Sequence, residues 1–368
     1  MQKLAACLST LFRSMFLLLS ASSLSGCYLI QAATGQMQIV SKRQPIAEVI
    51  RDPATSEKLK ARLEYVTAAR DFASHELGLP DNESYRSYAD VGRPYVVWNV
   101  FATPEFSVEP RRWCFPIAGC VVYRGYFKES SAERYALRMR SRGDDAMVGG
   151  VAAYSTLGHF RDPILNTMIS WSDAQLASTL FHELAHQVVY VPGDSEFNEA
   201  FATAVEEAGL TRWLTANGRE KELQLWHAIR QRQEQFIDLL LNTRSQLQEL
   251  YASKIPEEEM RARKQETLGR LKFEYSKLRA QWNGYSGYDW WFERALGNAH
   301  LVSAATYHGC MPGFERLLNS VNGDLPKFYD EVRRVSKLPK AERARMLCEE
   351  LKPDAEQPNA AQGAESGS

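Results

Sequence analysis

The sequence predicts a predominantly helical α+β protein, in which a small mixed sheet precedes a long series of helices. Two segments rich in β-branched and aromatic residues, 95–102 and 120–127, are typical of strands and lie in the N-terminal half. From Ser172 onward, apolar residues recur at helical spacing instead. Residues 219–282 then form two long, charged amphipathic segments, which indicate a helical hairpin.

Length and charge limit the kinds of protein that this chain can be. Its 368 residues, 45% of them hydrophobic and 24% charged, suffice for one large domain or two smaller ones with a sizeable core. The formal net charge is −1, and basic residues do not gather in a segment interleaved with aromatic residues. We therefore expect no nucleic-acid partner. The sequence does not indicate an oligomeric state.

The first residues have the features of an export signal. Lys3 and Arg13 accompany the apolar run 15–20, which is too short to span a bilayer and so predicts the core of a signal peptide. Small polar residues follow, and the segment ends in Leu24-Ser25-Gly26-Cys27.

This ending resembles the lipobox of bacterial lipoproteins, in which the cysteine thiol carries a diacylglyceryl group. The resemblance implies that residues 1–26 are a lipoprotein signal peptide and that the mature chain begins at Cys27. The protein is then anchored by lipid to the periplasmic face of the bacterial envelope. Tyr28 stands where an inner-membrane retention signal usually has aspartate, which favours the outer membrane. A plain signal peptide with an incidental cysteine is the alternative.

Export would place the other cysteines of the mature chain in an oxidising compartment. Their even number there indicates two disulfides, and local pairing is the simplest of the three possible connectivities. The expected bonds are Cys114–Cys120 and Cys310–Cys348. A zinc site made of cysteines is not expected, because the paired C-x-x-C spacing is missing.

The elements are expected in the following order along the chain. Residues 27–55 are interpreted as the lipid-anchored tether, residues 56–352 as the folded domain, and residues 353–368 as a disordered tail. The predicted elements of the domain are a helix over 56–77, strands over 95–102 and 120–127, a charged helix over 130–141, a strand over 146–158, a helix pair over 173–208, the hairpin 219–282 broken near Pro256, and a partly helical aromatic segment over 284–318. The hairpin is interpreted as a solvated structural arm.

Capping residues set the expected limits of the helix pair. Ser172 and Gln175 form a capping box before the first helix, which we expect to end near Tyr190. The second helix is expected over 196–208, with Gly209 as its left-handed cap.

The first helix of the pair contains the pattern H-E-x-x-H. Residues i and i+4 share one helix face, so His182 and His186 can both bind one zinc ion. Glu183 lies about 100° round the helix from His182, where its carboxylate can act as a general base on a water molecule. A third ligand is needed, and Glu199 follows His186 by 13 residues in the second helix. Glu206 is interpreted as a support for a ligand or a contact for a substrate amine.

The two motifs together resemble those of the gluzincin zinc peptidases, whose third ligand lies in an N-E-x-x-A motif on the next helix. Here that motif is Asn198-Glu199-x-x-Ala202, at a shorter separation than in the best-known members. The chain resembles more closely a bacterial family known as predicted aminopeptidases. Its shared stretches span most of residues 24–330 and include "CFPIAGCVVYRGYF", "AYSTLGHFRDPIL", "FHELAHQVVYVPGDSEFNEAFATAVEEAG" and "GNAHLVSAATYHGCMPGFERLL". The resemblance implies a metallopeptidase domain with one zinc ion, a peptide substrate and removal of N-terminal residues.

The gluzincin resemblance also implies roles for residues around the cleft. The segment 151–158 would be an edge strand whose backbone pairs with an extended peptide substrate, and Tyr154, Ser155 and Gly158 would line the cleft. Tyr307 is the first candidate for the hydrogen-bond donor to the oxyanion, with His308 or His300 as alternatives. Three polar residues of the segment 284–318 are also given roles: Asn298 would position substrate, and Asp289 or Glu293 would bind a substrate ammonium group.

Two other functions are compatible with the sequence. The chain could be a non-enzymatic envelope lipoprotein, in which the hairpin 219–282 is the working surface and the helix pair is structural. It could also use the same zinc chemistry on a non-peptide amide, such as one in the cell wall.

Overall fold

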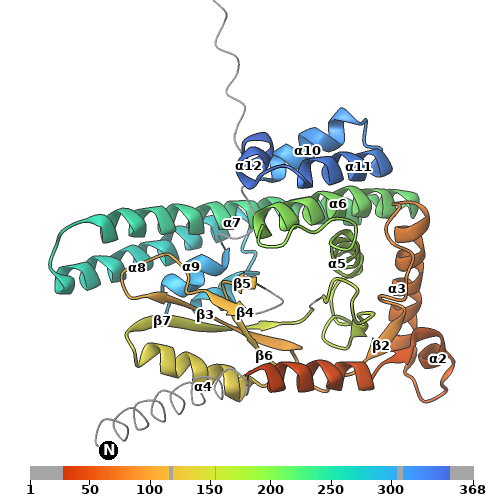
Figure 1. The fold of residues 1–368 in the computed structure, drawn as a ribbon, viewed down its shortest axis with the longest axis horizontal. Helices are drawn as coiled ribbons and strands as arrows, with labels where there is room; N and C mark the ends of the chain where they lie inside the picture. Colours follow the sequence, from red (N-terminus) through yellow and green to blue (C-terminus); the bar gives the residue numbers. More distant parts are fainter. Residues whose placement is uncertain (1–27, 116–118, 154, 305–309, 349–368) are drawn as a thin grey trace, which may run out of the picture.

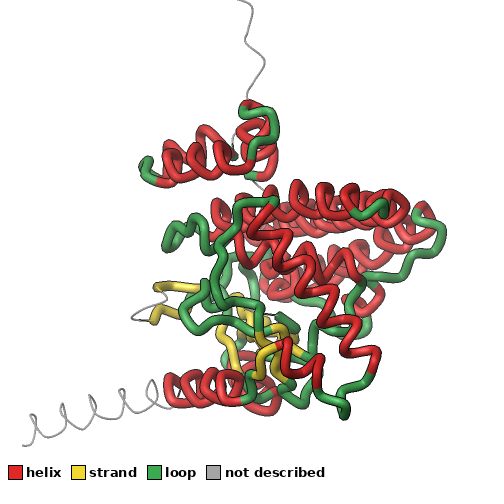
Figure 2. Tube along the Cα trace, turned by 90° about the vertical axis from the view of Figure 1, so that its right-hand side faces the viewer, coloured by secondary structure: helices red, strands yellow, loops and turns green. Residues whose placement is uncertain are grey.

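The computed structural model describes residues 28–115, 119–153, 155–304 and 310–348. As predicted, the protein is predominantly helical and has only small sheets. Long helices cross the molecule above the strands, and the C-terminal helices lie above them in turn (Figure 1). Figure 2 shows the same layers from the side. Within the described part of the chain, no helix is both long and apolar enough to cross a membrane.

The segment expected to be a tether is folded from residue 28 onward, which corrects that interpretation. Residues 28–41 are helical and are followed by β1 (Gln44–Pro45) and α2 (Ile46–Arg51). Ile39, Ile46 and Val49 are buried in the main core, so this segment is part of the globular body. The predicted helix after it is present as α3 (Glu57–His75).

The strands form three small sheets. In the largest, β3 (Val97–Pro104) lies between β6 (Arg124–Tyr126) and β7 (Asp144–Val151), and α4 (Glu129–Arg140) packs against it. A second joins β1, β2 (Ser87–Ala89) and β8 (Ile164–Leu165). The third is the hairpin β4 (Trp113–Phe115) with β5 (Gly119–Val121), and the predicted disulfide Cys114–Cys120 is confirmed there.

Two predicted strands differ from the structure. The strand predicted over 120–127 is divided into β5 and β6, with a bend between them. The strand predicted over 146–158 ends at Val151, because the chain beyond it turns toward Asp162. Thr156 is held there by the Asp162 carboxylate, which accepts hydrogen bonds from its backbone nitrogen at 2.8 Å and its hydroxyl at 2.7 Å.

The central helix pair is α5 (Asp173–Ala185) and α6 (Ser195–Ala216). Ser172 caps α5 as predicted, accepting a hydrogen bond from the Gln175 backbone at 3.1 Å. Helix α5 ends earlier than Tyr190, and α6 continues past Gly209, which is therefore not a cap. A Cβ at residue 209 would lie 2.8 Å from Leu77 Cδ1 and 3.1 Å from Phe181 Cδ2. Glycine is needed here for the close approach of α6 to its neighbours.

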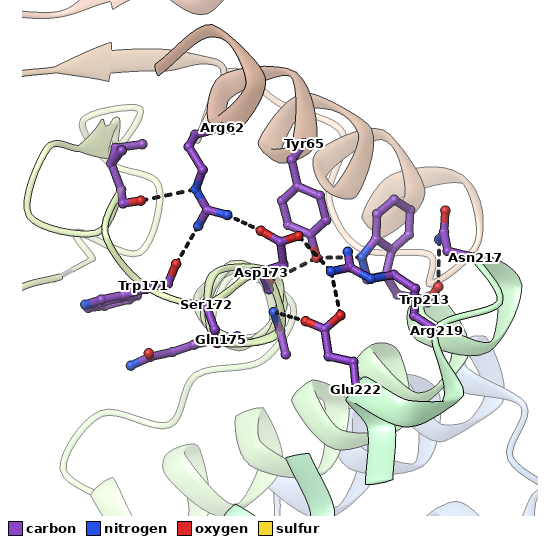
Figure 3. Close-up of polar contacts among 12 residues, drawn as sticks. Arg62, Tyr65, Trp171, Ser172, Asp173, Gln175, Trp213, Asn217, Arg219 and Glu222 are labelled. Atoms are coloured by element: carbon purple, nitrogen blue, oxygen red, sulfur yellow. Dashed lines mark hydrogen bonds and ion pairs between the residues drawn. The ribbon is translucent and has the colours of Figure 1, made fainter. Parts of the chain in front are cut away.

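A polar network fixes the start of α5 against α3 and α6 (Figure 3). Asp173 pairs with Arg62 of α3 and accepts a hydrogen bond from Arg219 Nη2 at 2.7 Å. The Tyr65 hydroxyl donates to the Asp173 carbonyl at 3.0 Å and accepts from Trp213 Nε1 of α6 at 2.9 Å. Since these contacts anchor the start of α5 to α3 and α6, they set the direction in which the rest of α5 runs.

The predicted helical hairpin is present as α7 (Glu220–Ala252) and α8 (Glu257–Gln281). The remaining elements are η1 (Asp289–Phe292), α9 (Asn298–Ala304), α10 (Met311–Ser320), α11 (Leu325–Ser336) and α12 (Lys340–Leu347). Helix α10 packs on α6, where the ring centroids of Phe314 and Phe197 are 5.2 Å apart. The predicted disulfide Cys310–Cys348 is confirmed and closes these C-terminal helices into a unit.

Candidate metal centre

The structure brings the three residues expected to bind metal to one point. His182 and His186 lie one turn apart at the end of α5, and their Nε2 atoms are 3.2 Å apart. Glu199, in the second turn of α6, places Oε2 3.3 Å from His182 Nε2 and Oε1 3.8 Å from His186 Nε2. One ligand atom from each residue lies within 4.8 Å of the others.

These spacings fit the ligand shell of a single zinc ion. Ligand atoms about 2.0–2.1 Å from a tetrahedral ion lie about 3.3–3.4 Å from one another, close to the distances found here. Two imidazoles and one carboxylate are also the ligand types of a catalytic zinc site, which keeps its fourth position open.

The short connection between α5 and α6 is held by Asn198. Its Oδ1 accepts a hydrogen bond from the Val191 backbone nitrogen at 2.8 Å, and its Nδ2 donates to the Val191 carbonyl at 2.9 Å. Gly193 has a φ of +78°, which glycine adopts without strain. The asparagine before Glu199 thus ties the turn to the first residues of α6, which brings Glu199 beside the histidines.

Glu206 is placed behind His182. Its Oε2 lies 3.0 Å from His182 Nδ1, and its side chain is largely buried. This contact selects the tautomer in which His182 donates from Nδ1 and keeps a lone pair on Nε2, facing the other ligands. Of the two roles expected for Glu206, support of a ligand therefore fits the structure, and contact with a substrate amine does not.

The surrounding carboxylates make the centre favourable for positive charge. Burial lowers the pKa of His182, but hydrogen bonds to Glu199 and Glu206 outweigh it and raise that pKa to about 10. Burial and the charge of His182 lower the pKa of His186 to about 4. One positive charge is thus stabilised between the two acidic side chains, whereas a second is not.

Glu183 is half-buried beside this group. Burial raises its pKa to about 7; the charge of His182 opposes this rise, while Glu199 and Asp162 add to it. A carboxylate with a pKa near neutrality can both accept and return a proton at physiological pH.

Ser155 and Gly158, expected to lie on an edge strand along the cleft, lie in a turn instead. The expected edge strand beyond Val151 is therefore wrong. The Ser155 hydroxyl donates to Asp162 Oδ2 at 3.2 Å. Gly158 has a φ of +80°, and a Cβ there would lie 2.8 Å from Gln187 Oε1. The turn thus passes close to the residue that follows His186, although its backbone does not form a strand. Tyr154 lies outside the described residues.

The side chain of Asn298 is hydrogen-bonded to other residues of the protein. It is fully buried, its Oδ1 accepts the Tyr251 hydroxyl at 2.8 Å, and its Nδ2 donates to the Glu105 carbonyl at 2.9 Å. These bonds engage both ends of the amide within the protein, and the role of Asn298 toward a substrate stays a prediction. His300 lines a separate cavity of about 320 Å³ between β7 and α9.

The residues expected to bind a substrate ammonium group, Asp289 and Glu293, lie in different environments. Asp289 accepts the Tyr275 hydroxyl at 2.6 Å and lies near Arg279, so it is paired within the hairpin region. Glu293 is exposed. Cys27, Tyr307 and His308 lie outside the described residues.

Three tyrosines near the centre were not predicted. Tyr190 is 47% exposed, and its ring centroid lies 6.3 Å from that of His186. Burial raises the pKa of Tyr123, and the nearby carboxylate of Glu199 raises it further. Tyr85 is buried near Glu183. Tyrosines are common in this chain, so nothing in their spacing distinguished these three.

Comparison with known proteins identifies a related family. A family model with the description "Putative aminopeptidase" matches residues 27–347. That range includes the metal-centre residues and all the described helices and strands. No curated protein and no solved structure matches the chain significantly.

Proposed function

The chain belongs to this family, since the match covers most of its length, and we propose that it is a zinc-dependent peptidase that removes residues from the N-termini of peptides. The observation that carries the proposal is the convergence of His182, His186 and Glu199 beside the half-buried Glu183, whose pKa is raised to about 7. The interpretation of residues 56–352 as a gluzincin-like metallopeptidase domain is part of this proposal.

Each residue of the centre has a distinct part in the proposed reaction. His182, His186 and Glu199 would hold the zinc ion, which when bound supplies a Lewis acid that polarises a carbonyl and lowers the pKa of water. Glu206 fixes the tautomer and orientation of His182. Glu183 takes a proton from the attacking water and delivers it to the leaving amine nitrogen, so water is added across the amide bond.

The edge of the main sheet supports a peptide substrate. Strand β7 lies at the end of the order β6-β3-β7, and the chain after it leads into the turn that Asp162 holds. A peptide in extended conformation can pair with a free strand edge through its backbone. Specificity for free N-termini rests on the family description.

We also propose that the protein acts outside the cytoplasm. The lipobox-like sequence ending in Cys27 supports a lipid anchor, and two disulfides are typical of proteins in oxidising compartments. Labelling with a radioactive fatty acid, with Cys27→Ser as the control, would test the anchor, and fractionation of the membranes would show which one carries it.

A digest of a peptide library by the zinc-loaded full chain tests the proposed activity. Cleavage one residue from free N-termini is expected, and acetylation of those termini should abolish it. Glu183→Gln should retain one zinc ion per chain and lose turnover. Internal cuts would contradict an aminopeptidase. A protein that retains zinc but hydrolyses no peptide would contradict peptidase activity altogether.

A further inference from the structure

The first described helix, residues 28–41, has an apolar face that points away from the protein. Leu29, Ile30 and Met37 are 47%, 67% and 59% exposed. Together with Ala33, which is also exposed, they recur at spacings of three and four residues and so form one stripe. The helix contains no charged residue at all. Because the outer face of a surface helix normally carries charged residues, this stripe is unusual for a helix that faces water.

The opposite face of the same helix is fixed to the body of the protein. Gln31 Nε2 donates a hydrogen bond to the Gly125 carbonyl at 3.3 Å, and Gln31 Oε1 accepts one from the Phe127 backbone nitrogen at 3.3 Å. A Cβ at residue 35 would overlap the Phe127 ring, and Ile39 is buried in the main core. The helix therefore cannot turn to bury its apolar stripe without losing these contacts.

The residue that follows the proposed lipid anchor is held as well. The Tyr28 ring stacks on Phe115 of β4 with centroids 5.0 Å apart, and the guanidinium carbon of Arg124 lies 4.2 Å from the Tyr28 centroid. Cys27 precedes Tyr28 by a single peptide bond, so their Cα atoms are about 3.8 Å apart. Acyl chains on Cys27 would therefore be joined to the folded body without a flexible linker, and they would enter a bilayer beside this helix.

The helix has the length and the position of a membrane contact. At about 1.5 Å per residue it is about 20 Å long, less than the hydrocarbon core of about 30 Å, so it can lie on a bilayer but cannot cross it. It runs along one edge of the molecule, at the bottom of Figure 1, while α10, α11 and α12 lie along the opposite edge. Figure 2 shows the same separation from the side.

We propose that the exposed face of helix 28–41 rests on a lipid bilayer and buries Leu29, Ile30 and Met37 among the headgroups and the first acyl carbons. This inference rests on the proposed lipid anchor at Cys27. Two acyl chains already suffice to retain a protein on a membrane, so the helix face contributes orientation rather than retention. It would hold the metal centre at a fixed height above the bilayer, which a flexible tether would not do.

Fluorescence quenching in proteoliposomes tests this orientation. The lipidated full chain would carry a polarity-sensitive fluorophore at Met37→Cys or, as the control, at Met346→Cys, which is 41% exposed on α12 at the opposite edge. The four cysteines downstream of Cys27 are in disulfides and would not react. In vesicles of phosphatidylethanolamine and phosphatidylglycerol, a spin-labelled lipid should quench the fluorophore at residue 37, and aqueous iodide should not. The fluorophore at residue 346 should show the reverse.

A charged variant tests whether the apolar stripe itself makes the contact. Ile30→Glu/Ala33→Glu should abolish most of the lipid quenching at residue 37, because two carboxylates would have to leave water. Both residues are exposed, so the thermal midpoint and the fatty-acid content should not change. Met346→Glu is the matched control and should leave the quenching at residue 37 unchanged.

Three results would overturn the inference, and they differ in what else they affect. Equal lipid quenching at residues 37 and 346 in a lipidated chain would show that the body does not rest on this face. Shielding of residue 37 from iodide without lipid quenching would show that protein covers the stripe instead. A chain that takes up no fatty acid at Cys27 would refute the proposed anchor and this inference together, whereas the first two results leave the anchor intact.

Discussion

The carboxylate of Glu206 on α6 lies 3.0 Å from Nδ1 of His182 on α5, on the side of the imidazole opposite the metal centre. The ring is thereby held between two acidic residues of the same neighbouring helix, Glu199 in front and Glu206 behind. Several properties of the centre follow from this arrangement.

Replacing Glu206 by glutamine should weaken zinc binding by about 10- to 100-fold, because His182 loses the acceptor that fixes its tautomer. A competition titration against a chromophoric chelator would measure the change. Glu207→Gln is the matched control, since Glu207 pairs with Arg230 and not with a histidine. Equal zinc affinities in the two variants would contradict the role of Glu206.

Zinc affinity should depend steeply on pH. Burial lowers the pKa of His182, but Glu199 and Glu206 raise it to about 10, so the metal-free imidazole carries a proton at neutral pH. Zinc requires the neutral ring, and binding therefore releases that proton. The dissociation constant should fall about tenfold for each unit of rising pH between 6.5 and 8.5. Calorimetry in buffers of different ionisation enthalpy would count the released proton, and a value near zero would contradict this prediction.

The close approach of α6 to Leu77 and Phe181 predicts opposite effects at two helical glycines. Gly209→Ala should destabilise the protein by about 1–3 kcal/mol, because the new methyl group overlaps Leu77. Gly269→Ala in α8 should stabilise it by up to about 1 kcal/mol, since no atom lies within 4 Å of the new Cβ. Urea denaturation of both variants measures the difference. Stabilisation by Gly209→Ala would show that the helices are not packed as described.

A buried ion pair joins the last helix to the start of α6. Arg343 Nη2 of α12 lies 2.6 Å from Asp194 Oδ2, and both side chains are at least nine-tenths buried. Arg343→Met leaves the buried Asp194 with only the exposed Lys340, whose Nζ lies 3.5 Å from its Oδ1, and should cost up to about 3–5 kcal/mol in the free energy of unfolding. The double variant Asp194→Asn/Arg343→Met should recover much of that loss. If it recovers none, the loss is due to the packing of Arg343 and not to its charge.

The sequence predicted those features of the centre that depend on local spacing. The i, i+4 spacing of His182 and His186, the capping of α5 by Ser172 and the disulfide Cys114–Cys120 are patterns within short segments, and the structure contains each of them. The helical hairpin followed equally from its periodicity.

The features that were missed depend on contacts between distant segments. Gly209 has the sequence context of a helix cap, and only its contact with Leu77 shows why it lies inside α6. The left-handed conformation of Tyr85 depends on Arg70 and on Asp162, which approaches from far along the chain. No local pattern encodes either relationship, because the residues meet only after the chain has folded.

The attachment of α12 to the start of α6 has a consequence for biosynthesis. Synthesis proceeds from the N-terminus, so the two histidines and Glu199 emerge well before Arg343 and Cys348. Until those late residues arrive, Asp194 has neither of its basic partners on α12 and Cys310 has no thiol with which to pair. The segment that carries Glu199 therefore reaches its final packing only when almost the whole polypeptide has been synthesised, so an incomplete chain would lack the assembled cluster of His182, His186 and Glu199.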